Sequence, residues 1–257
     1  MVRIDEKALA PQRWHDLRTL IREHGVIRVE DLCRVLKVSP ATVRRDLDEL
    51  DRAGAIRRVH GGAVSVEGRM EEPVFADKTA RAVREKRRIA EAALTFVEPG
   101  DTIYLDGGST VLELARLLRD RTNLTVVTNS VHAAVELAGR GPRLILIGGE
   151  MRRLSQTLVG PLTRLVLQQL HLDKAFMGTI GFSLKEGLTT TDPSEAFTKE
   201  LVMEQARRVI VMADGSKAGK VSFARAGRWE RVHILISDRS FDFGRALAKK
   251  GIKLVRA

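Results

Sequence analysis

The sequence predicts an α/β chain in two parts: three helices with a β-hairpin, then a mainly parallel sheet covered by helices. Before residue 66, three apolar helical stripes lead into a hairpin pattern. Beyond residue 98, short apolar strands alternate with helical stretches, which is typical of a parallel sheet. A length of 257 residues with 44% apolar residues is enough for two ordinary domains with real cores.

The first part has the element order of a winged helix-turn-helix. The expected elements are helices at residues 14–24, 29–36 and 40–53 and strands at residues 56–60 and 63–66. Gly25 can cap the first helix, and Gly61-Gly62 is a hairpin turn signal. A generic small core of three helices and a hairpin is the alternative interpretation.

The third helix is the most informative element of the chain. Ser39 is a natural N-cap, because its hydroxyl can accept a free amide of the first turn, and Pro40 fits the first helical position. One face carries Val43, Leu47 and Leu50, and the other carries Ala41, Arg44, Arg45 and Asp48. A small first-turn residue followed by two arginines suits a helix whose N-terminal end enters a DNA major groove.

We therefore expect the third helix to contact base edges and phosphates, and the hairpin to hold the DNA backbone. The predicted DNA-binding residues are Ser39, Thr42, Arg44, Arg45, Arg57, Arg58 and His60. The net charge of +11 and a pI near 10.3 also fit a polyanionic partner. Most of this excess lies outside the expected DNA-binding part, because residues 1–70 hold 14 Lys+Arg against 11 Asp+Glu.

Composition favours a cytoplasmic protein with no membrane segment. No apolar run reaches the roughly 18 residues of a membrane span, and the first residues lack an apolar signal-peptide core. A single cysteine, Cys33, excludes an internal disulfide and fits a reducing compartment. Because Cys33 lies in an apolar helical pattern, it is expected to be a small buried hydrophobe rather than a reactive thiol.

The second part is expected to repeat strand, loop and helix. The predicted strands are Thr102–Leu105, Leu124–Thr128, Arg143–Ile147, Lys174–Met177, Arg208–Ala213, His233–Ser237 and Lys253–Val255. The predicted helices are Thr110–Arg119, Ser130–Ala138, Pro161–Gln169, Ser194–Arg207 and Phe241–Lys250. Residues 67–78 read as a polar linker. A basic helix over residues 79–96 is either a solvated face or an additional phosphate-contacting patch.

Ligands of such a sheet bind in the loops beyond the carboxyl ends of its strands. After the first strand comes Asp106-Gly107-Gly108-Ser109-Thr110, directly before a helix. Glycines allow close backbone approach, hydroxyls donate hydrogen bonds and the helix N-terminus favours an anion, so this loop fits a phosphate cradle. No Gly-Lys-Ser/Thr closes it, so it is not a nucleotide-hydrolysing loop. A glycine-rich turn without any ligand is the alternative.

Other strand ends are polar in the same way. They carry Thr128-Asn129, Gly148-Gly149 and Asp214-Gly215-Ser216-Lys217. Glu195 and Lys199 lie one helical turn apart, either as a surface ion pair or as a carboxylate and an ammonium that face a polyol phosphate. The sequence contains neither the spacing of a metal site nor a nucleophile motif, so we predict no catalytic residues, no metal and no cofactor.

These motifs resemble the DeoR family of bacterial transcriptional regulators of sugar catabolism, over essentially the whole chain. The resemblance rests on residues 38–47, 57–63, 106–110, 128–129, 148–149, 187–190 and 214–217. It implies a DNA-binding domain at residues 1–66, a linker at 67–78, and an effector-binding and oligomerisation domain at 79–257 similar to the ribose-5-phosphate isomerase fold. Ala218-Gly219 departs from the family, which often has an aromatic residue there, and the hairpin is unusually rich in arginine.

The resemblance implies a repressor of a carbohydrate operon that a phosphorylated sugar or polyol releases from double-stranded operator DNA, acting as a homodimer or homotetramer. The predicted effector-binding residues are Asp106, Gly107, Gly108, Ser109, Thr110, Thr128, Asn129, Gly148, Gly149, Glu195, Lys199, Asp214 and Lys217. Two alternatives are an aldose-ketose phosphate isomerase that uses the same acids and Lys217, and a constitutive architectural DNA-binding protein.

Overall fold

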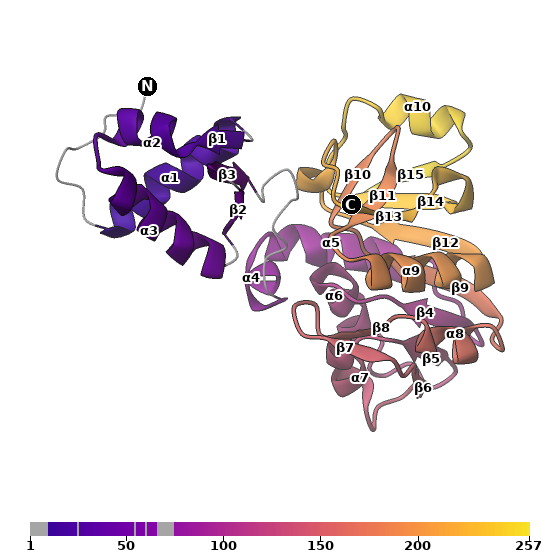
Figure 1. Cartoon of the computed structure of the whole chain (residues 1–257). Coiled ribbons are helices and arrows are strands. Elements are labelled where there is room, and N and C mark those ends of the chain that lie inside the picture. Colours follow the sequence, from indigo (N-terminus) through magenta and orange to yellow (C-terminus); the bar gives the residue numbers. More distant parts are fainter. Residues whose placement is uncertain (1–9, 25, 54, 60, 66–74) are drawn as a thin grey trace. The chain divides into compact units, whose positions relative to one another are not determined.

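The computed structural model describes all residues except 1–9, 25, 54, 60 and 66–74. Contacts divide the chain into two compact units, residues 1–71 and residues 72–257 (Figure 1). Each unit has its own apolar core. The two-part α/β organisation predicted from the sequence is confirmed.

The N-terminal unit is a winged helix-turn-helix, as predicted. Its elements are α1 (Ala10–His24), β1 (Val26–Arg28), α2 (Val29–Leu36), α3 (Pro40–Arg52), β2 (Ile56–Val59) and β3 (Gly62–Ser65). The strands form an antiparallel sheet in the order β1-β3-β2. β1 was not predicted, because three residues are too few to show a period of two.

Helix α3 is positioned by its cap and its apolar face. The Ser39 hydroxyl accepts a hydrogen bond from the amide of Thr42 at 3.2 Å, and Pro40 occupies the first turn. Val43 and Leu47 are fully buried and pack with Leu32 of α2 in one core cluster. Burial of this face leaves the opposite face of α3, with Ala41, Arg44 and Arg45, exposed to solvent.

A seven-stranded parallel sheet forms the centre of the second unit. Its strands are β4 (Thr102–Leu105), β5 (Thr125–Thr128), β6 (Arg143–Leu146), β9 (Leu172–Met177), β12 (Ala206–Met212), β14 (Ile234–Ser237) and β15 (Lys253–Arg256). The order is β15-β14-β12-β9-β4-β5-β6, and every pairing is parallel. The chain therefore reverses its direction of winding between β4 and β9.

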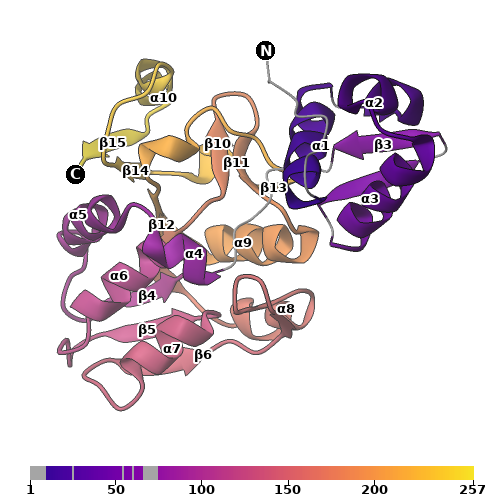
Figure 2. The ribbon, with the colours of Figure 1, turned by 90° about the vertical axis from the view of Figure 1, so that its left-hand side faces the viewer.

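Helices cover both faces of this sheet (Figure 2). One face packs against α5 (Val83–Leu94), α6 (Ser109–Leu117) and α7 (Val131–Leu137). The other packs against α8 (Leu162–Leu167), α9 (Pro193–Gln205) and α10 (Gly244–Lys249). This layering explains why the strands read as continuous apolar runs in the sequence.

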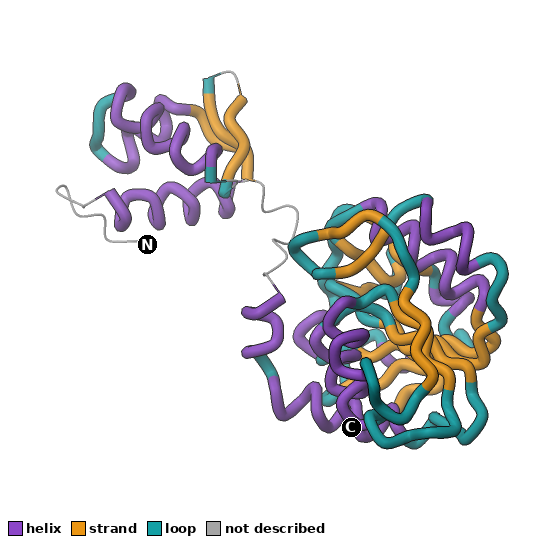
Figure 3. The backbone as a smooth tube through the Cα atoms, turned by 90° about the horizontal axis from the view of Figure 1, so that it is seen from below, coloured by secondary structure: helices purple, strands orange, loops and turns teal. Residues whose placement is uncertain are grey.

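Several short strands lie outside the main sheet, and they were not predicted. All strands are orange in Figure 3. β7 (Glu150–Arg152) and β8 (Thr157–Val159) form a hairpin. β10 (Gly181–Ser183), β11 (Gly187–Thr190) and β13 (Ala224–Gly227) form a second sheet. These strands have three or four residues, many of them glycine or polar, so they show neither apolar periodicity nor high β-propensity.

The segment before the sheet differs from the sequence-based prediction. Phe75–Ala80, which overlaps the predicted linker, forms the helix α4, and Phe75 is buried and stacks on His132 at 3.9 Å between ring centroids. The single helix predicted over residues 79–96 is broken at Ala82, which has a φ of +50°. Lys86, expected on a solvated face, is buried, and its ammonium donates to the carbonyl oxygens of Lys78 and Arg81. Those bonds satisfy the end of α4.

Candidate functional site

The candidate ligand site lies where the sheet reverses its winding. The loops that follow β4 and β9 lie side by side there, because the two strands are neighbours in the sheet. The carboxylate of Asp106, after β4, accepts a hydrogen bond from the amide of Gly178, after β9, at 2.8 Å. This point of an open α/β sheet is where ligands bind most often.

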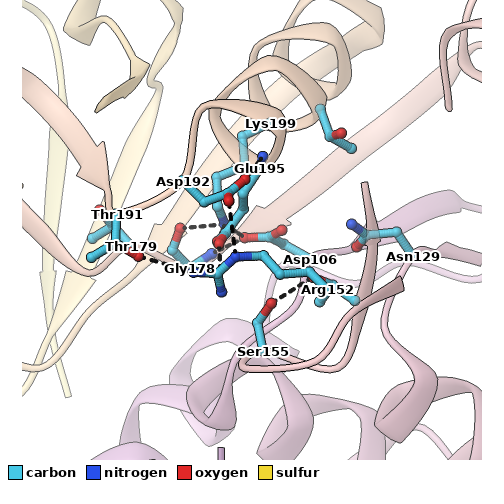
Figure 4. Close-up of polar contacts among 12 residues, drawn as sticks. Asp106, Asn129, Arg152, Ser155, Gly178, Thr179, Thr191, Asp192, Glu195 and Lys199 are labelled. Atoms are coloured by element: carbon cyan, nitrogen blue, oxygen red, sulfur yellow. Dashed lines mark hydrogen bonds and ion pairs between the residues drawn. The ribbon is translucent and has the colours of Figure 1, made fainter. Parts of the chain in front are cut away.

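A buried ion pair closes the floor of this site (Figure 4). Lys199 of α9 donates to Asp106 and also to the carbonyl oxygen of Gly178, and it lies 3.4 Å from a Glu195 oxygen. Burial alone would lower the pKa of Lys199, but the two carboxylates outweigh it and raise that pKa. The lysine is therefore charged and fixed in position at neutral pH.

Arg152 of β7 extends the network toward the start of α9. Its guanidinium lies 3.4 Å from Glu195 and 3.5 Å from Asp192, and it donates to the Thr191 hydroxyl at 3.0 Å. Asp192 also caps α9, accepting from the amide of Glu195 at 2.8 Å. Acids and bases alternate through the site, so each charge has a partner that holds it in place.

A narrow pocket opens above this floor. It is lined by Lys78, Gly107, Gly108, Ser109, Thr110, Val111, Ser155, Gly178, Thr179, Ile180, Glu195, Lys199 and Lys217. No side chain caps the N-terminus of α6, which begins at Ser109. The Thr110 hydroxyl is buried and has no hydrogen-bond partner in the described structure. Unpaired donors at a helix N-terminus are the groups that bind an anion.

The backbone of the loop after β4 requires glycine at two positions. Gly108 has a φ of +138°, which residues with a side chain rarely adopt. A Cβ atom on Gly107 would lie 2.1 Å from a methyl carbon of Thr157, so only glycine lets the β4 loop pass beneath the β7–β8 hairpin. The conformation that exposes the α6 amides therefore depends on both glycines.

Several lysines lie in or near the pocket. Burial and the nearby ammonium groups of Lys86, Lys78 and Lys199 lower the pKa of Lys217 to about 8, although Asp214 at 3.8 Å acts in the opposite direction. The Lys217 side chain is still 23% exposed, so it can reach a bound ligand. A dianion placed here would relieve the repulsion among these lysines.

The structure brings together seven of the predicted effector-binding residues in the pocket lining. They are Gly107, Gly108, Ser109, Thr110, Glu195, Lys199 and Lys217. Two more support the lining from behind. Asp106 holds Lys199, and Asp214 accepts hydrogen bonds from the Ser216 amide and hydroxyl.

Four predicted effector-binding residues lie outside the lining. The Thr128 hydroxyl donates to the carbonyl of Leu105, and the Asn129 amide donates to the carbonyl of Leu158, so both connect neighbouring strands. Gly148 and Gly149 follow β6 at the edge of the sheet. A Cβ atom on Gly149 would lie 2.8 Å from the carbonyl oxygen of Val159, so this glycine permits close packing of β8.

Sequence reasoning missed several residues of the site. Lys78 was assigned to a linker. Arg152 belongs to β7 and Ser155 follows it, and β7 was not predicted. Gly178-Thr179 directly follow a predicted strand. The rule that ligand loops follow strands could therefore have found this pair.

The N-terminal unit exposes two arginines of α3, the expected recognition helix. Arg44 and Arg45 are exposed, and neither has an ion pair in the described part of the chain. The Thr42 hydroxyl lies 2.9 Å from that of Ser39, at the start of the same helix. Free guanidinium groups on an exposed helix face are available for guanines and phosphates.

Other groups of this unit hold the recognition helix in place. Asp46 of α3 is buried and accepts from Arg13 at 2.6 Å and from the Trp14 indole at 2.9 Å. The β2–β3 hairpin is the wing of this unit. Arg58 of the wing donates to Asp48 of α3, and its amide donates to Asp51 at 3.1 Å. Arg58, predicted to contact DNA, thus also ties the wing to the helix. His60 and the Arg57 side chain lie outside what the structure describes.

The first unit is a winged helix with free arginines, and the second is an α/β unit with a lysine-lined pocket. This combination is typical of DNA-binding regulators with an attached sensor unit. A model of the DeoR-like helix-turn-helix domain matches residues 13–69, and a model of the DeoR C terminal sensor domain matches residues 81–239. The chain belongs to the DeoR family of transcriptional regulators.

Individual relatives agree with this assignment. The uncharacterized HTH-type transcriptional regulator FruR of Bacillus subtilis is 33% identical, over 96% of this chain and 99% of its own. The lactose phosphotransferase system repressor of Streptococcus mutans is 36% identical, over 88% of this chain and 91% of its own. Ribose 5-phosphate isomerase A of Methanocaldococcus jannaschii overlaps 52% of this chain and 53% of its own, with 20% identity and a TM-score of 0.39.

These names favour a regulator over the isomerase alternative, because the relatives that match nearly the whole chain are regulators. Within the described residues, no helix is long and apolar enough to cross a membrane. In the same residues, no cluster of three or more His, Cys, Asp or Glu side chains could hold a metal ion.

Proposed function

We propose that this protein represses a carbohydrate-utilisation operon and leaves its operator when a phosphorylated sugar or polyol binds the second unit. The observation that carries the proposal is the anion cradle at the start of α6. It combines uncapped helix amides, the buried unpartnered hydroxyl of Thr110 and the crowded ammonium of Lys217. The name of the lactose phosphotransferase system repressor supports repression and a sugar-linked signal.

In this proposal the phosphate lies on the amides and hydroxyls of Ser109 and Thr110, with Lys217 and Lys78 as counter-charges. The carbon chain then extends toward Glu195 and Lys199. Asp106, which is 3% exposed and already paired with Lys199, acts by holding that lysine rather than by touching the ligand. The lysines neutralise the phosphate charge, and Glu195 accepts hydrogen bonds from the sugar hydroxyls.

Regulation requires a ligand that binds one arrangement of the protein better than another. The cradle is narrow, with about 30 Å³ of free space between its walls. We therefore infer that a phosphate ester shifts part of the lining when it binds. Lys78 belongs to α4, which directly follows the segment that joins the two units in sequence. The chain that runs from Lys78 back through α4 is the shortest covalent connection between the cradle and the DNA-binding unit. A displacement of α4 would therefore carry the signal along this connection.

The DNA partner of this proposal is a double-stranded operator, read by Arg44 and Arg45 in the major groove. We expect the protein to act as a homodimer or homotetramer, because paired recognition helices read paired half-sites. Sedimentation of the protein with and without an operator duplex measures this state. A monomer on DNA would contradict the expectation.

The test starts from an operator selected by the full-length protein from a random duplex library. Fluorescence anisotropy of that operator is then followed while sugar and polyol phosphates are added, with the free sugars as controls. We expect one phosphate ester to release the DNA while its free sugar is inactive. Lys217→Gln should weaken the release at least tenfold, whereas Lys185→Gln, at a 92% exposed position, should not change it.

Two results would contradict the proposal in different ways. Release by the free sugar as well as by the ester would remove the phosphate cradle from the mechanism. A ligand that binds, by calorimetry, yet leaves operator affinity unchanged would leave the cradle in place and favour the constitutive DNA-binding alternative.

A further inference from the structure

A second cavity lies at the β15 edge of the sheet, near the carboxyl ends of β14 and β15. It encloses about 410 Å³, which is within the range of small-molecule pockets. Its lining shares no residue with the cradle. We propose that this cavity binds a second ligand, an organic anion in which a phosphate or carboxylate is attached to an apolar or planar body.

The sheet register builds the cavity floor in two zones. Leu235 of β14 pairs with Leu254 of β15, and two residues further on Ser237 pairs with Arg256. Residues two apart on a strand project to the same face, so the four side chains share one surface. Its first half is apolar, and its second half, at the strand ends, is polar and cationic.

The start of α10 encloses the apolar half. A Cβ atom on Gly244 would lie 3.3 Å from a Leu254 methyl carbon and 3.6 Å from the Phe241 ring. The helix thus begins directly above Leu254, with the Phe241 ring beside it. An aromatic ring and two leucine side chains give a ligand body apolar contacts.

The polar half has excess positive charge. Arg239, Arg245 and Arg256 line the cavity, and none has an ion pair among the residues that the structure describes. Asp242 is the only acidic residue in the lining. Arginine is the side chain best suited to bind carboxylates and phosphates through paired hydrogen bonds.

A second observation independent of the arginines also indicates a ligand. Ser237 is 4% exposed, and its hydroxyl has no hydrogen-bond partner in the described structure. A buried hydroxyl without a partner is unfavourable, and such groups are rare in folded proteins. An anionic oxygen at the end of the cavity would accept its hydrogen bond.

The test uses the full-length protein with labelled leucine and threonine methyl groups, titrated with phenyl phosphate and followed by NMR. Leu235 and Leu254 report on the cavity, and Thr110 reports on the cradle. We expect the leucine signals to shift saturably, with inorganic phosphate and phenol each binding there at least tenfold more weakly. These comparisons test separately the need for an anion and for an apolar body.

Substitutions then assign the binding to the arginines. In R245Q/R256Q the dissociation constant of phenyl phosphate, measured from the leucine methyl signals, should rise at least tenfold. The titration of the Thr110 signal should be unchanged. The control R140Q/R231Q removes the same charge from exposed positions outside the cavity and should bind normally. Ser237→Ala should weaken binding severalfold without lowering the melting temperature, because the hydroxyl loses no bond in the free protein.

Three outcomes would overturn the proposal. They are leucine signals that stay fixed up to millimolar phenyl phosphate, equal dissociation constants in the two double variants, and phenol that binds as tightly as its phosphate. Because the Thr110 signal is recorded in the same titration, failure at this cavity is distinguishable from failure of the cradle.

Discussion

Lys199 of α9 and Asp106 at the end of β4 form a buried ion pair, at 3% exposure for each residue. The pair joins a helix on one face of the sheet to the loop that leads into α6 on the other face. Glu195 adds a second carboxylate to the same ammonium, at 3.4 Å. The geometry of the cradle therefore depends on a charge that solvent does not reach.

Replacement of Lys199 by methionine should strongly destabilise the second unit. It leaves the Asp106 and Glu195 carboxylates buried near each other without their shared cation, and breaking such a pair costs about 3–5 kcal/mol. Trp229 lies in this unit and Trp14 in the other, so tryptophan fluorescence during urea unfolding can follow each unit. In single-tryptophan variants, only the Trp229 transition should move.

The double variant Asp106→Asn with Lys199→Met is the control for this interpretation. It removes a negative and a positive charge together, so its loss of stability should be smaller than the sum of the two single losses. Strictly additive losses would show that the two side chains do not act as a pair.

Much of this fold could be predicted because the central strands of the parallel sheet are largely buried. Most strands of the parallel sheet contain a short apolar run, and the loop at residues 106–110 follows the first of them. Those two facts led to the cradle residues from Gly107 to Thr110. The β7–β8 hairpin could not be found in the same way, since its three-residue strands lack a pattern.

The interaction partners of charged residues could not be predicted from the sequence either. Glu195 and Lys199, one helical turn apart, read equally well as a surface ion pair and as ligand contacts. The long-range neighbour Asp106 instead makes Lys199 a buried cation. Lys86 is a second example. Its basic surroundings on a helix suggested solvent, whereas the break at Ala82 turns it inward onto the end of α4.

Binding of a phosphate ester should weaken as the pH rises through about 8. That is the pKa of Lys217 in the free protein, and the protonated lysine is the form that attracts a dianion. Phosphate esters lose their second proton near pH 6, so affinity should be highest between about pH 6.5 and 7.5. Above pH 8 the dissociation constant should rise by up to tenfold per unit.

Calorimetry in two buffers of different ionisation enthalpy measures this effect, because the bound anion raises the pKa of Lys217 and draws in a proton. Lys217→Gln should lose both the proton uptake and the change in affinity above pH 8. A wild-type affinity that is constant from pH 7 to 9 would show that Lys217 does not contact the phosphate.

Arg45→Gln should weaken operator binding without changing stability. The guanidinium is exposed and has no ion pair in the described structure, so unfolding should change by less than about 0.5 kcal/mol. Loss of a bidentate contact with guanine corresponds to about 1–3 kcal/mol, or about 5- to 150-fold in affinity. The control Arg52→Gln removes an exposed arginine paired with Glu49 at 2.8 Å on the same helix.

Arg58→Gln should behave differently from Arg45→Gln, since Arg58 ties the wing to Asp48. The pair is partly exposed, so its loss should destabilise the N-terminal unit by about 1 kcal/mol or less. The affinities for the operator and for other DNA sequences should fall by the same factor, because a displaced wing alters contacts with the DNA backbone and not with the bases. Anisotropy titrations with the operator and a scrambled duplex separate these effects. A loss confined to the operator would instead indicate a base contact.

Lys86→Met should uncouple the cradle from the DNA-binding unit. The buried ammonium satisfies the carbonyl oxygens of Lys78 and Arg81, and its own pKa is lowered by that burial. Methionine fills a similar volume but leaves both carbonyls unpaired, which costs about 1–3 kcal/mol. Amide exchange in residues 75–82 should accelerate, whereas Arg87→Met, on the exposed face of α5, should leave it unchanged.

The informative comparison in the Lys86→Met protein is between ligand binding and operator release. If α4 transmits the signal, the protein should still bind its operator and should bind the ester with reduced affinity, since Lys78 is no longer held at the cradle. At saturating ester, however, the operator should be only partly released, because a loosened α4 transmits no defined displacement. Full release at saturation would show that the signal leaves the cradle by another element, and α9, which carries both Glu195 and Lys199, would then be the next candidate.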